Sequence, residues 1–260
     1  MQLSYIRRCQ IGPAVLIVKD LKLGSRISLI HITLFQENRS AVVGYVTVSD
    51  EVSETGISVP TNWKIDRSSA GDNTVHSPPL VESDGVKEKC QSPWKKVVIA
   101  NPGFRRASSR VELYERKDDT ADPTSGGQWA RLRPQGQEGG FEKWTMESVA
   151  FLTDILPTAL GHLERVVHVN RKRGDNVSRE PAPVWFPTLA LNIDFKKCIV
   201  GVKDEWLYSH VHIKSVQNGR MDVEVAIIDA SEEIVAVSTQ AVLVMSSERN
   251  TVRRNRRGSL

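Results

Sequence analysis

Several features are scarce or missing in this chain of 260 residues, and each absence excludes a class of protein. No run reaches the roughly 18 consecutive apolar residues that a membrane-spanning helix needs. Arg7 and Arg8 are not followed by an uninterrupted apolar stretch and a small-residue cleavage site, as a secretory signal requires. With 40% hydrophobic and 25% charged residues, the composition instead predicts a soluble, cytoplasmic protein with a sizeable core.

Cysteine and net charge are also low. The three cysteines are widely spaced, which indicates neither a disulfide framework nor a zinc site. His210 and His212 alternate on one predicted strand, but no third metal ligand accompanies them. The net charge is +4, and no aromatic residues interleave with the arginines of residues 249–257, as stacking on nucleic acid would require. We therefore expect no cofactor, no metal, no nucleic acid and no membrane partner, and a basic disordered tail over residues 248–260.

What the chain has is strand-forming sequence. Four runs rich in Val, Ile, Leu and Thr lie between residues 185 and 244, each bounded by turn residues, and predict an antiparallel meander. Asn218-Gly219 lies between two of these runs and is a strong hairpin signal.

The strand pattern occurs twice. An offset of 194 residues superimposes Arg26 on Arg220 and Val48 on Val242, and many apolar positions between them agree. Two copies of one β unit are therefore expected, the first near the N-terminus and the second near the C-terminus.

The sequence between the two units contains one strong helix signal. Thr145 is a suitable N-cap, and Val149, Leu152 and Leu156 form a broad apolar face that predicts a largely buried helix. Pro157 is a stop signal. We also expect short strands at 97–99 and 110–114, a turn at 125–127, and a loop from residue 170 to residue 183.

A long helix wrapped by an antiparallel sheet is the hot-dog arrangement. The predicted fold is therefore α+β, a double hot-dog whose first unit is incomplete, because the first half offers only the late strands of such a unit. The expected boundaries are a partial unit at 1–49, a linker at 50–102, a second unit at 103–247 and the tail.

Several motifs together resemble the thioesterase-like double hot-dog proteins, which are related to type II acyl-CoA thioesterases and common in filamentous fungi. They are G-F-R-R-A-S-S-R-V-E-L-Y, G-Q-W-A-R-L-R, V-A-F-L-T-D-I-L-P, W-F-P-T-L-A-L-N-I-D-F, D-E-W-L and V-S-T-Q-A-V-L-V. The resemblance covers most of residues 3–49 and 103–247.

The resemblance implies a hydrolytic site in which a helix Asp, a strand Thr and a last-strand Gln hold the attacking water. Asp154 matches the Asp position, and Gln240 matches the Gln position. The Thr position falls on Asn192, a departure from the family pattern, and Asp194 or Thr188 are alternatives for its role. Asp154 would act as the general base, and the amides of Asn192 and Gln240 would position the water.

The implied function is hydrolysis of acyl thioesters, with acyl-CoA or a carrier-bound acyl or polyketide chain as substrate. A homodimer and a role in fungal secondary metabolism are further implications. The rival interpretation is a non-catalytic hot-dog module that binds an acyl chain or a protein. A dehydratase on the same fold is a third, but its Asp and His pair is not visible. Each candidate residue also has a non-catalytic interpretation. Asp154 would be a solvated residue near a helix end, and Gln240 would lie on a solvent face of its strand.

Overall fold

The computed structural model describes ten segments of the chain. They are residues 1–50, 55–61, 63–65, 78–79, 93–99, 106–117, 122–133, 141–174, 184–199 and 205–246. The predicted tail at 248–260 and much of the predicted linker lie outside these segments. Within them, no helix is both long and apolar enough to cross a membrane.

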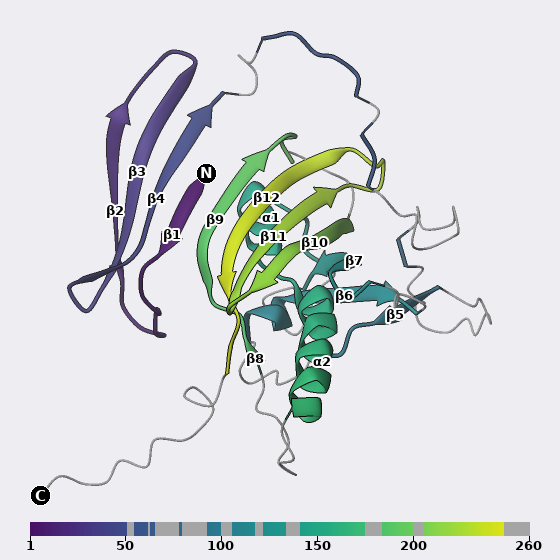
Figure 1. Ribbon diagram of the computed structural model, residues 1–260. Coiled ribbons are helices and arrows are strands. Elements are labelled where there is room, and N and C mark those ends of the chain that lie inside the picture. Colours follow the sequence, from purple (N-terminus) through teal and green to yellow (C-terminus); the bar gives the residue numbers. More distant parts are fainter. Residues whose placement is uncertain are drawn as a thin grey trace, which may run out of the picture.

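One antiparallel sheet of 11 strands dominates the fold (Figure 1). Its strands are β1 (Gln2–Tyr5), β2 (Val15–Lys22), β3 (Ile27–Gln36), β4 (Arg39–Ser49), β5 (Trp94–Lys96), β6 (Val111–Arg116), β7 (Ser125–Leu132), β9 (Thr188–Phe195), β10 (Leu207–Gln217), β11 (Arg220–Ile228) and β12 (Ile234–Leu243). The short strands β8 (Val184–Trp185) and β13 (Met245–Ser246) form a separate pair. The helices are α1 (Met146–Leu152) and α2 (Pro157–Gly174), with a 3-10 helix at Arg106–Arg110.

The strand order repeats the sequence duplication. It runs β2-β3-β4-β1-β9-β12-β11-β10-β7-β6-β5, so the order β2-β3-β4-β1 is mirrored by β9-β12-β11-β10 across a seam between β1 and β9. The tight turns also correspond, because Glu37-Asn38 and Asn218-Gly219 both take positive φ angles, as a two-residue hairpin turn requires.

The predicted four-strand meander is only partly correct. β10, β11 and β12 are consecutive neighbours, but β9 pairs with β12 rather than with β10. Residues 196–206 separate β9 from β10, a connection too long for a tight hairpin, and β10 lies on the far side of β11. This order leaves β9 at the seam beside β1.

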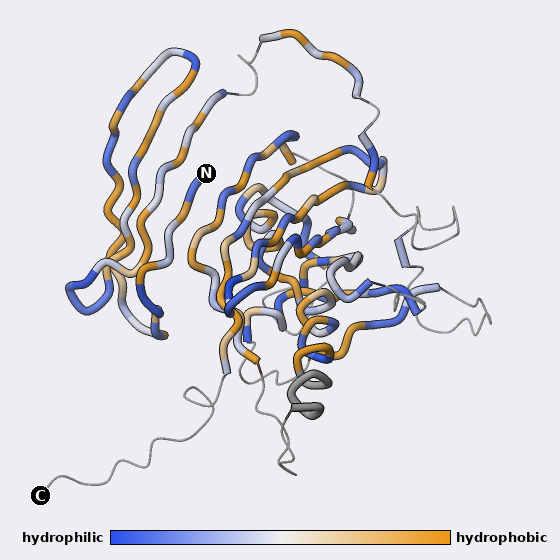
Figure 2. Tube along the Cα trace, viewed as in Figure 1, coloured by the Kyte–Doolittle hydropathy of each residue, from blue (hydrophilic) through white to orange (hydrophobic). Residues whose placement is uncertain are grey.

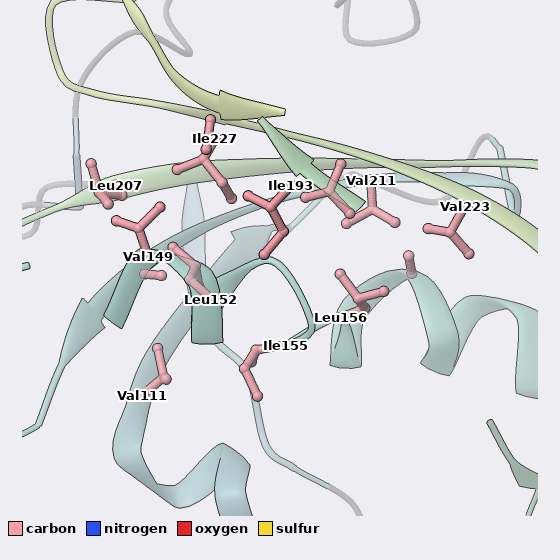
Figure 3. Packing of buried hydrophobic residues seen from close by; sticks show 14 of the residues in the cluster. Val111, Val149, Leu152, Ile155, Leu156, Ile193, Leu207, Val211, Val223 and Ile227 are labelled. Carbon is pink, nitrogen blue, oxygen red and sulfur yellow. The ribbon is translucent and has the colours of Figure 1, made fainter. Parts of the chain in front are cut away.

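The helix prediction is confirmed at its start and changed at its end. Thr145 caps α1 and forms a reciprocal capping box with Ser148. Pro157 stops α1 but begins α2, because proline needs no hydrogen-bond acceptor at the first helical position. Residues 170–174, which were expected in a loop, belong to α2, and residues 175–183 lie outside the described segments. Figure 3 shows apolar side chains of α1 and of the turn before α2 packed beneath the sheet.

Two glycines expected in a turn lie inside strand β7. Gly126 faces α2, where a Cβ atom would lie 3.5 Å from the Ala159 backbone, so the helix packs closely on the strand. Gly127 faces the other side, where the Tyr208 phenol occupies the space of a missing side chain. The turn prediction at 125–127 was wrong because close packing, not chain reversal, explains this glycine pair.

The sheet has an inner face, which α1 and α2 cover over β7 and β9–β12, and an opposite outer face. Residues paired directly across neighbouring strands point to the same face of a sheet. Leu191 on the inner face pairs with Leu3, Leu3 pairs with Gly44, and Gly44 pairs with Ile32, so the inner face continues across the seam. Strands β2–β4 contain many apolar residues (Figure 2), and register places Val18 of β2 beside Ile32 of β3 on this face, over which no helix of the described segments lies (Figure 1). Leu16 and Val18 of β2 remain more than half exposed there.

The pairing of β1 with β4 depends on Gly44 of β4, which leaves room for the backbone and side chains of β1. A Cβ atom on Gly44 would lie 2.5 Å from the carbonyl oxygen of Gln2 and from Leu3 Cδ2. We expect Gly44→Ala to lower the free energy of unfolding by about 1–3 kcal/mol, because the clash forces β1 away from β4. Urea denaturation measures the loss. Gly56→Ala is the control, since nothing lies within 4 Å of its Cβ position, and equal stability of the two variants would contradict the prediction.

Candidate active site

The site is built on the break between α1 and α2. In a continuous helix the carbonyl of Thr153 would accept a hydrogen bond from residue 157, but Pro157 has no N–H group. Gln240 of β12 replaces that donor, with its Nε2 atom 2.7 Å from the Thr153 oxygen. Its side chain is buried, so the predicted catalytic Gln lies on the inner face and not on a solvent face.

A second glutamine holds the same turn from another strand. Gln128 of β7 places its Nε2 atom 2.7 Å from the carbonyl oxygen of Ile155 and is buried. Thr153 and Ile155 flank Asp154. Amides from two strands therefore donate hydrogen bonds to the backbone carbonyls on either side of it. In the described part of the chain, the Oε1 atoms of both glutamines have no hydrogen-bond partner.

Asp154 projects from this buried turn toward the seam. Thr188 Oγ1 of β9 donates a hydrogen bond to Asp154 Oδ1 at 3.0 Å. The carboxylate is accessible to solvent. Desolvation by the packed groups around it nevertheless raises the pKa of Asp154 and outweighs the lowering effect of the Thr188 hydrogen bond.

Thr188 reaches this face because β9 contains an irregularity. Ala241 pairs with Ala190, but the next residue of β12, Val242, pairs with Thr188, which leaves Leu189 as an extra residue in β9. A bulge of this kind reverses the alternation of side chains. Thr188 therefore shares the inner face with Leu191, although strict alternation would place them on opposite faces.

Asn192 does not join the other two predicted site residues. It pairs with Thr239, and its Nδ2 atom lies 3.3 Å from Thr239 Oγ1 on the outer face. There it helps to line a groove of about 1460 Å³ together with Glu224 and His212. Asp194, two residues further along β9, forms an ion pair with Lys196. Of the residues considered for the Thr position, only Thr188 contacts Asp154.

Tyr5 brings the first half of the chain to the site. This half-buried phenol lies on β1, next to the seam, and its pKa is raised to about 12 by burial and by the negative charge of Asp154. The sequence contained no signal for Tyr5 or Gln128. The expected Thr on the strand after the helix was a usable signal for Thr188.

No metal site accompanies these groups. Among the residues that the structure describes, no cluster of three or more His, Cys, Asp or Glu side chains is placed to hold a metal ion. His212 lines the outer groove, on the other side of the sheet from Asp154. The groups that meet at the turn are a carboxylate, a hydroxyl and two amides.

Two family models match the chain. The model of the acyl-CoA thioesterase C-terminal domain matches residues 81–244, and that of the N-terminal domain matches residues 1–49. The thioesterase-like protein TwmA of Talaromyces wortmannii is 26% identical over an alignment of 279 positions, which covers 95% of this chain and 76% of that protein.

Solved structures share the fold. The acyl-CoA thioesterase II TesB2 of Mycobacterium marinum has a TM-score of 0.59 at 16% identity, with 94% of this chain and 79% of that chain covered. A conserved protein with a hot-dog fold from Alicyclobacillus acidocaldarius has a TM-score of 0.60 at 13% identity, with 94% and 77% covered. At these identities the likeness shows a hot-dog fold.

The raised pKa of Asp154 has a consequence for stability. The folded state holds the carboxyl proton more tightly than the unfolded chain, so this group makes the protein lose stability as pH rises above its ordinary pKa of 3.8. We expect Asp154→Asn to raise the free energy of unfolding at pH 8, because the amide carries no charge and its oxygen can still accept from Thr188. The gain should vanish near pH 4. Urea denaturation at both pH values measures it, and a less stable variant at pH 8 contradicts it.

Proposed function

Because the chain belongs to the acyl-CoA thioesterase family, whose chemistry is acyl-thioester hydrolysis, we propose that Asp154, Thr188 and Gln240 form its hydrolytic site. The observation that carries the proposal is their convergence on one turn. Thr188 bonds the Asp154 carboxylate, and Gln240 bonds the backbone carbonyl next to it. Thr188 thus takes the role that the sequence suggested for Asn192.

Asp154 acts as the general base in this proposal. Its carboxylate takes a proton from a water molecule, whose oxygen attacks the thioester carbonyl carbon. The tetrahedral intermediate collapses, the carbon–sulfur bond breaks, and the leaving thiolate takes the proton from Asp154, which gives a carboxylic acid and a thiol and regenerates the carboxylate. The raised pKa of Asp154 makes it a stronger base than an ordinary carboxylate.

The neighbouring groups orient the reactants. The Thr188 hydroxyl fixes one carboxylate oxygen, which leaves Asp154 Oδ2 for the water. Gln240 holds the Thr153 carbonyl and so fixes the backbone that carries the carboxylate. α2 begins three residues after Asp154, and the N-terminus of a helix is suited to stabilise the oxyanion.

We propose acyl-CoA as the substrate class, with carrier-bound acyl or polyketide chains as the variant. The family description supports the first. The similarity to a thioesterase-like protein of a Talaromyces fungus accords with a fungal setting, and a cytoplasmic role in secondary metabolism is part of the proposal. The architecture that we propose is a double hot-dog with an incomplete first unit, supported by the mirrored strand orders.

One observation favours the non-catalytic alternative. The inner face of β1–β4 is apolar and exposed, whereas the equivalent face of β9–β12 is covered by α1 and α2. A module that binds acyl chains or protein through this face would need no Asp154 chemistry. The two functions differ in whether acyl-CoA is turned over.

Turnover of acyl-CoA tests the hydrolytic function directly. We expect release of free CoA thiol by the wild-type protein, a loss of about 10²–10⁴ in kcat/KM for Asp154→Ala, and a smaller loss for Thr188→Val. Asn192→Ala is the matched control, because its side chain lies on the outer face, and it should keep the wild-type rate. Absence of turnover on acyl chains of every length, or an active Asp154→Ala variant, would remove the assignment.

We also propose a homodimer in which the exposed inner face of β1–β4 packs on a second copy. Leu16→Lys with Val18→Lys places two charges on that face, where these side chains are 59% and 52% exposed. Burying the charges is costly, so the doubly substituted chain should shift toward a monomer. Light scattering after size exclusion should show the change from twice 29.0 kDa to 29.0 kDa. Ile17→Lys, on the outer face of the same strand, should remain dimeric, and a monomeric wild-type protein would refute the dimer.

A further inference from the structure

We propose that Gln128 is a positioning residue for Asp154, because its buried amide holds the backbone that carries the carboxylate. This inference rests on the proposed hydrolytic function. Gln128 is distant in sequence from the three proposed site residues and lies on β7, four strands away from Thr188 on β9. It touches the Ile155 carbonyl and not the carboxylate.

The break between the helices creates the need for this amide. With α2 beginning at Pro157, the Leu156 carbonyl accepts an α-helical hydrogen bond from the Leu160 N–H group. The Ile155 carbonyl accepts from Gln128 instead, at 2.7 Å. A buried carbonyl without a donor is unfavourable, so the turn holds its shape only while an amide reaches it from the sheet.

The position of Gln128 is rigidly determined. Its side chain is 1% exposed, and its strand is paired with β10 on one side and β6 on the other. Two residues earlier, Gly126 lets α2 approach the same strand. The distance between β7 and the start of α2 is therefore set by packing, and a long amide spans the remaining gap to Ile155.

Gln128 and Gln240 make a two-point clamp. Gln240 fixes the carbonyl before Asp154 and Gln128 fixes the carbonyl after it, from strands β12 and β7, between which β11 and β10 lie in the sheet. Two fixed carbonyls define the orientation of the intervening Cα–Cβ bond. Thr188 can hold the carboxylate at 3.0 Å only in that orientation. Loss of one fixed point should let the turn rotate and open to water.

The test compares Gln128→Leu with Ser209→Ala. Ser209 pairs with Gln128 on the same face, is buried, and its Oγ atom has no partner in the described segments, so its loss perturbs the core without touching the turn. We expect kcat for acyl-CoA to fall about 10- to 100-fold in Gln128→Leu with KM nearly unchanged, as for a misplaced catalytic group. Ser209→Ala should keep the wild-type kcat.

A second readout is independent of turnover. The pKa of Asp154 can be followed by ¹³C NMR of labelled Asp carboxyl groups, with Asp154→Asn to assign the signal. In Gln128→Leu the pKa should fall toward its ordinary value, because the opened turn hydrates the carboxylate. If the wild-type protein hydrolyses no acyl-CoA, the proposed function fails, yet this measurement still decides the role of Gln128. An Asp154 pKa and a kcat equal to those of Ser209→Ala overturn the inference.

Gln128→Glu keeps the inference testable if the leucine variant does not fold. A protonated Glu can donate to the Ile155 carbonyl, whereas an ionised Glu cannot. A buried carboxyl of this kind titrates well above its usual range. We therefore expect Gln128→Glu to retain activity only at pH values above the pKa of Asp154 and below that of the introduced carboxyl, and so to gain a descending limb at high pH that the wild-type profile lacks. A pH profile identical to that of the wild-type protein overturns the inference.

Discussion

The missing N–H group of Pro157 is the constraint around which the site is organised. It interrupts the helix beneath the sheet and leaves the Thr153 carbonyl without its usual donor. The buried amides of Gln240 and Gln128 bond the carbonyls on either side of Asp154, so the sheet completes the bonding that the helix cannot. A carboxylate placed on such a turn is held firmly while one side of it still meets solvent.

The position of this turn at the seam explains why both halves of the chain contribute. The β1–β9 pairing brings Tyr5 of the first half toward Asp154 of the second, and the negative charge of Asp154 raises the pKa of that phenol. A helix covers the inner face on one side of the seam, whereas the apolar inner face on the other side is open in the described segments. The two halves share the order of four strands, but only the second half is extended by β7, β6 and β5 and covered by helices.

Local signals were sufficient for several elements. Asn218-Gly219 forms a hairpin because both residues accept positive φ, and Thr145 caps α1 because its hydroxyl accepts from Ser148. Local sequence could not decide whether Asn192 or Thr188 lies beside Asp154. Strict alternation made it as acceptable as Thr188, but the extra residue in β9 reverses the alternation and sends the two side chains to opposite faces.

The sequence alone determined the duplication, the capped apolar helix and the family motifs that marked Asp154 and Gln240. These follow from neighbouring residues, whose spacing encodes turns and periodicity. Only the tertiary structure decided which strands became neighbours at the seam and which hydroxyl bonds Asp154. It also revealed that Gln128 supports the turn. Contacts of this kind join residues far apart in the chain, and their geometry depends on register and packing that no local pattern specifies.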